Sequence, residues 1–196
     1  MTMNATEIVE ALTPLVEAFE ELGVPYYIGG SVASSTYGES RPTQDVDIVA
    51  DLQFQHVRPL VKQLEAEYYI DADAVRDAIR HRSSFNAIHN NTMLKVDVFI
   101  PKSRQFSQQE RLRARPGVLL EGTRPFYFSS PEDIILNKLE WYRMGDGVST
   151  RQWKDMLGIL KRGKDLDLTY LQQWAISLRV SDLLERALIE AGLKNQ

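Results

Sequence analysis

The sequence contains no cysteine. This absence excludes disulfide bonds, thiolate zinc sites and a cysteine nucleophile. The three histidines, His56, His81 and His89, do not have the spacing of a zinc site. The chain also lacks any run of about eighteen apolar residues, and it therefore predicts no membrane-spanning helix and no membrane partner. The first residues do not combine a basic segment with an apolar one. We therefore expect no secretory signal and predict a cytoplasmic protein.

A glycine-rich turn and a pair of aspartates lie close together early in the chain. The apolar segment Tyr27-Ile28 ends in Gly29-Gly30-Ser31, and the small residues that follow predict a short helix over residues 31–37. The N-terminus of such a helix presents unpaired N–H groups to a phosphate. Residues 45–50 then predict a strand in which Asp45 and Asp47 share one face. Two adjacent carboxylates repel each other, and a hard divalent cation such as Mg²⁺ resolves that conflict.

A third carboxylate belongs to a later predicted strand, residues 93–100. Its alternation places Asp97 on the face opposite Val96 and Val98. If this strand lies beside the Asp45/Asp47 strand, three carboxylates converge. They would then hold two metal ions roughly 4 Å apart, as phosphoryl or nucleotidyl transfer requires. Lys95 lies on the same face as Asp97, where it either pairs with these carboxylates or contacts a phosphate.

Taken in this order, the motifs resemble the nucleotidyltransferase fold of the DNA polymerase β superfamily over about residues 25–100. The chain resembles in particular the minimal bacterial members of this superfamily, which include the toxin subunits of abortive-infection type IV systems. The resemblance implies an α/β (α+β) fold with a mixed β-sheet flanked by helices, plus a C-terminal helical bundle. We expect a catalytic core at residues 1–128 and a helical region, packed on that core, at residues 129–196.

The resemblance also implies roles for the motif residues. Gly29, Gly30 and Ser31 would bind the triphosphate of a nucleotide. The three aspartates, Asp45, Asp47 and Asp97, would be catalytic and would bind Mg²⁺, with Mn²⁺ as an alternative. The last of them would also help to activate the attacking hydroxyl.

A weaker similarity lies in the C-terminal half. The toxins have a lysine on one helix, and an arginine and an aspartate at the start of the next, which Lys138, Arg151 and Asp155 match. The family usually has an acid directly after the arginine, whereas Gln152 stands there in this chain. Lys138 and Arg151 would bind nucleotide opposite the metals. The alternative is a salt bridge between the lysine and Asp155, which we favour for that aspartate.

Arg41 precedes the aspartate strand. It would either contact a phosphate or cap the sheet, and the sequence leaves both interpretations open. We count Arg41 with the candidate nucleotide-binding residues.

The activity implied by the resemblance is transfer of a nucleoside monophosphate from an NTP to a hydroxyl acceptor. The acceptor would be a tRNA or another RNA, a protein, or a small molecule, and the sequence does not choose among them. A toxin would also have an antitoxin partner. The alternative is a non-catalytic nucleotide-binding or interaction protein with the same fold.

The net charge of −4 conceals an uneven distribution. Residues 1–80 contain fourteen acidic and five basic residues, whereas residues 81–196 contain thirteen acidic and eighteen basic ones. An acidic metal side that faces a basic side suits a site for metal-bound polyphosphate. For most of these residues, however, a solvated helix face is the better explanation.

Periodicity predicts the remaining elements. We expect a first helix from residue 8 to 22, with a kink or restart at Pro14, and one or two strands between residues 118 and 128. A hairpin is expected to join residues 84–89 to residues 92–100 through Asn90-Asn91. The three tryptophans are predicted to be core residues: Trp141, Trp153 and Trp174. Helices are predicted over residues 54–66, 72–80, 107–114, 131–144, 149–161, 168–178 and 181–191.

Overall fold

The computed structural model describes residues 4–38, 45–145, 150–163 and 165–194. It divides into two compact units. The sheet unit comprises Met1–Val32 and Pro42–Phe128, and the helical unit comprises Ala33–Arg41 and Ser129–Gln196. Arg41, a candidate phosphate contact, lies outside the described residues.

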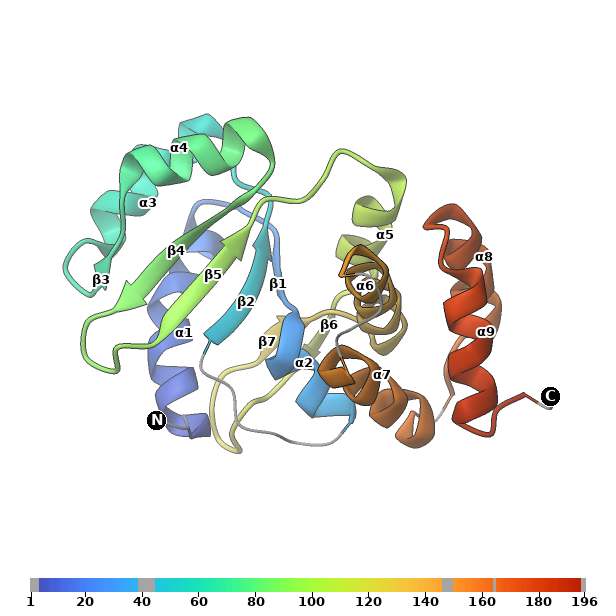
Figure 1. Ribbon diagram of the computed structural model, residues 1–196. Helices are drawn as coiled ribbons and strands as arrows, with labels where there is room; N and C mark the ends of the chain where they lie inside the picture. Colours follow the sequence, from blue (N-terminus) through green and yellow to red (C-terminus); the bar gives the residue numbers. More distant parts are fainter. Residues whose placement is uncertain (1–3, 39–44, 146–149, 164, 195–196) are drawn as a thin grey trace. The chain divides into compact units, whose positions relative to one another are not determined.

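A seven-stranded mixed sheet forms the centre of the sheet unit, with the order β3-β4-β5-β2-β1-β7-β6 (Figure 1). The β2–β5 and β1–β7 pairs are parallel, and the other neighbours are antiparallel. The hairpin predicted from Asn90-Asn91 is the β4–β5 pair. The strand bounds are β1 Tyr26–Ile28, β2 Asp45–Ala50, β3 Tyr68–Tyr69, β4 Ser84–His89, β5 Lys95–Phe99, β6 Arg115–Gly117 and β7 Phe126–Phe128.

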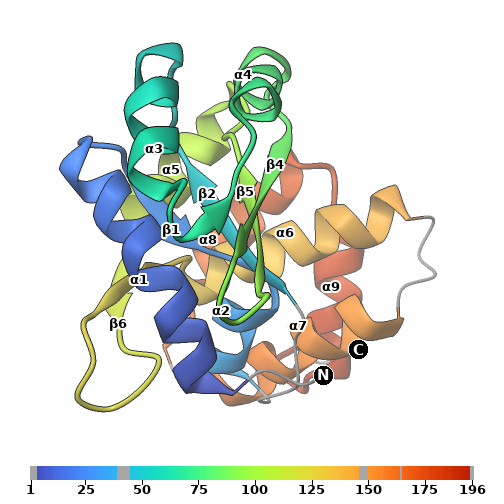
Figure 2. The ribbon, with the colours of Figure 1, turned by 90° about the vertical axis from the view of Figure 1, so that its left-hand side faces the viewer.

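One face of this sheet is the core of the unit. Along β2 and β5 every second residue is buried, including Val46, Ile48, Val96 and Val98, and the residues between them are half-buried. Helices α1 and α3 lie together on one side of the sheet (Figure 2). The helices of this unit are α1 Ala5–Glu21, the short 3₁₀ helix η1 Phe54–His56, α3 Val57–Leu64, α4 Ala72–His81 and α5 Gln105–Arg113.

Helix α1 continues through Pro14, contrary to the expected kink or restart. Its start is fixed by a capping box between Asn4 and Glu7, whose side chains each accept a hydrogen bond from the other residue's backbone N–H. Seven apolar side chains of the helix are buried. We attribute the continuity of the helix to this burial. Its stabilising free energy outweighs the loss of the one backbone hydrogen bond that Pro14 cannot make.

The segment before β7 also differs from the prediction. Strands were expected within residues 118–128, but only Phe126–Phe128 is a strand there, and its antiparallel partner is Arg115–Gly117. Arg-Pro-Gly has no β-forming residue. It is an edge strand of the sheet, a position where proline does not have to donate a hydrogen bond to a neighbouring strand.

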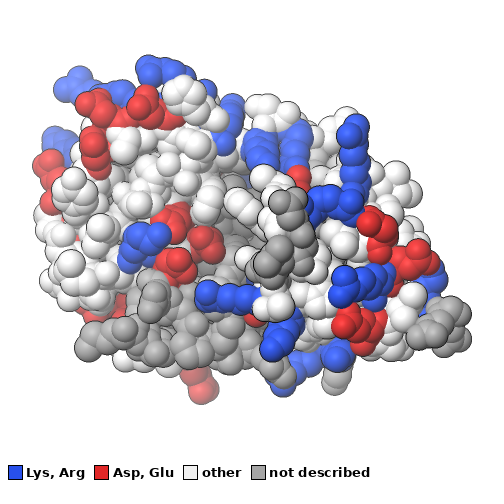
Figure 3. All heavy atoms as spheres, viewed as in Figure 1, with Lys and Arg blue, Asp and Glu red and all other residues white. Residues whose placement is uncertain are grey.

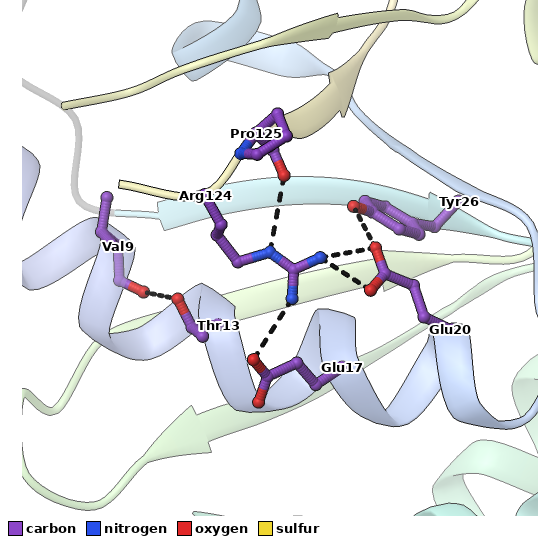
Figure 4. Close-up of polar contacts among 7 residues, drawn as sticks. All are labelled: Val9, Thr13, Glu17, Glu20, Tyr26, Arg124 and Pro125. Atoms are coloured by element: carbon purple, nitrogen blue, oxygen red, sulfur yellow. Dashed lines mark hydrogen bonds and ion pairs between the residues drawn. The ribbon is translucent and has the colours of Figure 1, made fainter. Parts of the chain in front are cut away.

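Arg124 ties the loop before β7 to helix α1 (Figure 4). Its Nη2 donates to both carboxylate oxygens of Glu20, at 2.6 and 2.7 Å, and its Nη1 donates to Glu17 Oε1 at 3.4 Å. Glu20 also accepts a hydrogen bond from the Tyr26 hydroxyl at 3.3 Å. Burial raises the pKa of Tyr26 above its ordinary value, and the negative charge of Glu20 acts in the same direction.

Replacing Arg124 with alanine is expected to lower the free energy of unfolding by about 1 kcal/mol, because a bidentate ion pair is lost at a partly exposed position. The control is Arg76→Ala on α4, which removes an exposed i,i+3 pair with Asp73 and should cost roughly 0.3 kcal/mol. Urea unfolding measures both. An Arg124 variant that loses no more stability than the control would contradict the expectation.

Among its described residues, the helical unit contains helices and no strand. Ser130 caps α6, and its side-chain oxygen accepts a hydrogen bond from the backbone N–H of Asp133 at 3.2 Å. Helix α6 contacts α7 and α8, and α9 contacts both α7 and α8. The helices are α6 Pro131–Met144, α7 Thr150–Arg162, α8 Leu168–Ser177 and α9 Ser181–Glu190, together with the end of α2 (Gly30–Tyr37).

No helix in the described part of the chain is both long and apolar enough to cross a membrane.

Candidate nucleotidyl-transfer site

The structure brings the three predicted aspartates to one face of the sheet. Strand β5 runs parallel to β2, with Asp47 opposite Asp97 and Asp45 opposite Lys95. The two strands are neighbours, which is the condition under which the sequence brings the three carboxylates together. Residues directly opposite each other project to the same side of a sheet, and these positions alternate with buried ones. The carboxylates therefore lie on the face that is not the core of the sheet unit.

Asn86 of β4 belongs to this face as well. It lies opposite Asp97 on the other side of β5. No sequence motif marks this residue. The predicted hairpin was the available signal, because a two-residue turn at Asn90-Asn91 would pair residue 86 with residue 95, which shares a face with Asp97.

Lys95 compensates the carboxylates. Its Nζ donates to Asp97 Oδ2 at 2.6 Å, and the Asp97 side chain is only 15% exposed. This hydrogen bond raises the pKa of Lys95 above its ordinary value, and the negative charges of all three aspartates add to the effect while burial opposes it. Of the two interpretations of Lys95, the structure contains the pairing with a carboxylate. Acidic side chains gather over β2 and β5 beside a basic one in Figure 3.

The carboxylates suit a metal ion in their chemistry and in the face they share. Three carboxylates on adjacent strands are the donors that a hard divalent cation prefers, and the Lys95 ammonium shows that positive charge is accommodated among them. As the side chains lie, however, the described residues contain no group of three or more carboxylate or imidazole side chains close enough together to hold a metal ion. Because Lys95 contacts Oδ2 of Asp97, this aspartate would ligate a metal through its other oxygen or after the ion pair opens.

The glycine turn lies directly against Asp47. The Gly29 N–H donates to the Asp47 carbonyl oxygen at 2.9 Å. Gly30 has φ 55°, and a Cβ built on it would lie 1.7 Å from Asp47 Oδ2. No side chain fits there without displacing the carboxylate. The close approach of backbone to carboxylate therefore depends on glycine at this position.

Helix α2 begins at Gly30, one residue earlier than predicted. Ser31 is its second residue and is buried, with 8% of its surface exposed. The Gly-Gly-Ser segment is thus a strand-to-helix turn whose first helical N–H groups lie next to the Asp47 strand. This is the geometry that a phosphate requires at a helix N-terminus.

Lys138 and Arg151 belong to the helical unit. Lys138 of α6 donates to Asp155 Oδ2 and to Gln152 Oε1 of α7, both at 3.0 Å. The side chains of the lysine and the aspartate are 7% and 11% exposed. The interhelical salt bridge proposed for Asp155 is therefore present, and Gln152, which stands where the toxins have an acid, is the second acceptor. Arg151 lies exposed at the start of α7.

Comparison with known proteins places the fold. No family model matches the sequence, and no curated protein matches it. Among solved structures, the solution structure of the antibiotic-resistance factor ANT(2'')-Ia is 17% identical, with a TM-score of 0.55 over 95% of this chain and 97% of its own. A crystal structure of ANT(2'')-Ia with adenylyl-2''-tobramycin is 14% identical, with a TM-score of 0.56 over 87% of this chain and 96% of its own. The lincomycin-bound lincosamide antibiotic adenylyltransferase LnuA is 16% identical, with a TM-score of 0.50 over 81% of this chain and 98% of its own.

At these identities the similarity shows the fold alone. It agrees with the fold predicted from the sequence, a mixed sheet flanked by helices with further helices after the last strand. The more specific resemblance to abortive-infection toxins stays a prediction. The chain has the nucleotidyltransferase fold.

Proposed function

We propose that this protein is a divalent-metal-dependent nucleotidyltransferase that transfers a nucleoside monophosphate from an NTP to a hydroxyl group. The observation that carries the proposal is the register of β2 and β5, which puts Asp45, Asp47 and Asp97 on one sheet face, with Gly30 closely packed against Asp47. Adenylyltransferases among the solved structures of similar fold support the reaction class.

In the proposed reaction, the acceptor oxygen forms a bond to the α-phosphorus, the bond from that phosphorus to the β-phosphate oxygen breaks, and pyrophosphate leaves. Asp45 and Asp47 would hold Mg²⁺, with Mn²⁺ as the alternative. The bound metal would supply Lewis-acid stabilisation of the phosphate charge. Asp97 would accept the proton of the acceptor hydroxyl once it has separated from Lys95. Lys95 would then be available to a phosphate as a point charge.

Nucleotide binding is assigned to the backbone around the glycine turn. The N–H groups of Gly30, Ser31 and the next residues of α2 would donate to the triphosphate, with Gly29 shaping the approach. Arg41, Lys138 and Arg151 remain candidate nucleotide contacts. For Lys138 this role would require its buried pairing with Asp155 to open.

Several acceptor classes are compatible with this site. ANT(2'')-Ia with adenylyl-2''-tobramycin and lincomycin-bound LnuA support a small molecule. The sequence resemblance to toxins supports a tRNA or another RNA end or a protein side chain, with an antitoxin as partner. Incubation with NTPs labelled at the α-phosphate and with cell lysate, fractionated into RNA, protein and small molecules, identifies the acceptor by the fraction that gains label.

The second candidate is a non-catalytic nucleotide-binding or interaction protein. The Lys95–Asp97 ion pair favours it, because the lysine partly neutralises the carboxylates with no metal required. Release of pyrophosphate from NTP in the presence of lysate distinguishes the two candidates, since binding alone releases none.

We expect Mg²⁺ or Mn²⁺ to raise the melting temperature of the wild type, and NTP to increase the effect, because a ligand at 100 times its dissociation constant stabilises a fold by about 2.7 kcal/mol. For a chain of this size that corresponds to roughly 5–10 °C. Asp47→Asn should abolish the shift, whereas Asp73→Asn on the exposed side of α4 should keep it. Thermal unfolding with EDTA, metal, and metal plus NTP measures this. A wild type that responds to neither addition would remove the three-carboxylate site.

A further inference from the structure

A cavity of ≈ 380 Å³ opens on the sheet unit at the end of β2 away from Asp45. Val49 lines it and, because residues alternate along a strand, lies on the same sheet face as Asp47. Tyr27 of β1, paired with Val49, lines it too. Two residues along a strand span roughly 6.6 Å. The cavity therefore begins about that far from Asp47.

We call this cavity the Asp51 pocket. The residues that line it carry more positive than negative charge. Three basic residues, Arg82, Lys102 and Arg111, line it together with one acid, Asp51. Arg111 Nη1 lies 3.0 Å from one Asp51 oxygen, and Arg82 Nη1 lies 4.0 Å from the other. The two guanidinium groups thus share one carboxylate, and an excess of two positive charges remains for a ligand.

Arg82 occupies an unusual backbone position. It ends helix α4 in the left-handed region, with φ 50° and ψ 45°, where glycine or asparagine is the common residue. Its guanidinium also donates to the carbonyl of Pro101, another lining residue, at 3.2 Å. Arg82 therefore adopts a backbone conformation that is unfavourable for residues with a side chain, and its guanidinium lies at the pocket.

We propose that the Asp51 pocket binds a phosphate group of the acceptor and so positions the acceptor hydroxyl at the aspartates. The proposal rests on the proposed function for the chemistry at Asp97. The surplus positive charge favours a phosphate-bearing acceptor and disfavours a polycationic one such as an aminoglycoside, because like charges would meet at the rim. The pocket begins roughly 6.6 Å from Asp47, two residues along the same face of β2, which suits a phosphate and a hydroxyl within one nucleotide or one sugar phosphate.

The test measures binding without metal or NTP. The wild type is titrated in EDTA with two phosphorylated probes, a short 5′-phosphorylated oligoribonucleotide and ribose 5-phosphate, and with the same compounds lacking the phosphate. We expect the phosphorylated form of at least one probe to bind more tightly, and the stronger of the two identifies the source of the phosphate. Arg111→Ala should weaken that binding about ten-fold, as expected for a lost charged hydrogen bond.

Two further variants separate charge from folding. Asp51→Asn should strengthen probe binding, because it removes the one acid that competes for the two arginines, and weaker binding would overturn the proposal. Arg82→Gly should weaken probe binding and leave the melting temperature unchanged or raised, because glycine suits the left-handed position. Arg58→Ala removes an exposed arginine of α3 that does not line the pocket; it is the matched control and should bind as the wild type does.

The predicted triphosphate site could also bind a phosphate, and Ser31→Ala distinguishes the two locations. Loss of probe binding in Ser31→Ala with retention in Arg111→Ala would place the phosphate at the glycine turn and overturn the proposal. Equal binding of phosphorylated and unphosphorylated probes would overturn it as well. The proposed function fails separately: it requires metal- and NTP-dependent stabilisation and pyrophosphate release, neither of which is measured with these probes.

Discussion

Replacing Asp97 with asparagine is expected to lower nucleotidyl transfer by about 10²–10⁴-fold, the usual contribution of a positioned general base. Asparagine keeps the size and shape of the side chain but cannot accept the proton of the acceptor hydroxyl. Asp45 and Asp47 stay in place on β2, which pairs with β5 through the backbone. Much of the binding of metal and NTP should therefore remain. The measurement is transfer of α-labelled nucleotide to the acceptor fraction, beside NTP affinity by calorimetry.

A second effect of this substitution has to be separated from the first. Lys95 donates to Asp97 at 2.6 Å, and Asp97→Asn removes the charge of its partner. The ammonium would remain near Asp45 and Asp47, whose charges already act on it, and would repel a metal ion there. Lys95→Met combined with Asp97→Asn removes that repulsion. Transfer that returns to the wild-type rate in the double variant would show that Asp97 acts only by restraining Lys95.

Equal transfer by wild type and Asp97→Asn would exclude the carboxylate from the reaction. If the wild type transfers no nucleotide from any NTP to any fraction, the non-catalytic candidate becomes the better explanation of the same site. The two results differ because only the first leaves pyrophosphate release intact.

The arrangement of the aspartates could be predicted because it depends on strand periodicity and on which two strands are neighbours. Alternation fixes which residues of β2 and β5 are buried, and Asp45, Asp47 and Asp97 take the remaining positions. That the two strands are neighbours follows from the resemblance to a known fold. Neither argument gives the rotamers. The sequence offered a carboxylate or a phosphate as the partner of Lys95, and it could not decide between them, because the pairing with Asp97 depends on the rotamers of both side chains.

Elements that depend on tertiary context were predicted less well. Trp141 was expected in the core but is 55% exposed, because the buried side of α6 passes through Leu139 and Tyr142 instead. Trp153 is buried as predicted. Strand β6 has no β-forming residue and exists only through its pairing with β7. The Asp51 pocket collects residues from strands β1 and β2, from helix α5 and from loops far apart in the chain, for which no local pattern exists.

Gly30→Ala is expected to abolish the metal response and to reduce transfer by at least 10²-fold, although it adds a single methyl group. The added Cβ would lie 1.7 Å from Asp47 Oδ2 and 2.6 Å from the Asp47 carboxylate carbon. Because atoms cannot approach so closely, either Asp47 rotates away from the shared face or the start of α2 moves. The left-handed φ of 55° adds a cost of roughly 1–2 kcal/mol to folding for any residue with a Cβ.

Gly29→Ala is the matched control, one residue earlier in the same turn. A Cβ on Gly29 would have no atom within 4 Å, and its φ is not in the left-handed region. We expect the free energy of unfolding of Gly29→Ala to lie within roughly 0.5 kcal/mol of the wild-type value. The variant should also keep the metal-dependent rise in melting temperature. Its NTP affinity should fall if the triphosphate approaches the turn there, as the sequence predicts. Urea unfolding, thermal unfolding with metal, and NTP titration of both variants measure the difference. A Gly30 variant that keeps both its stability and its metal response would show that the close approach of this turn to Asp47 has no role in the site.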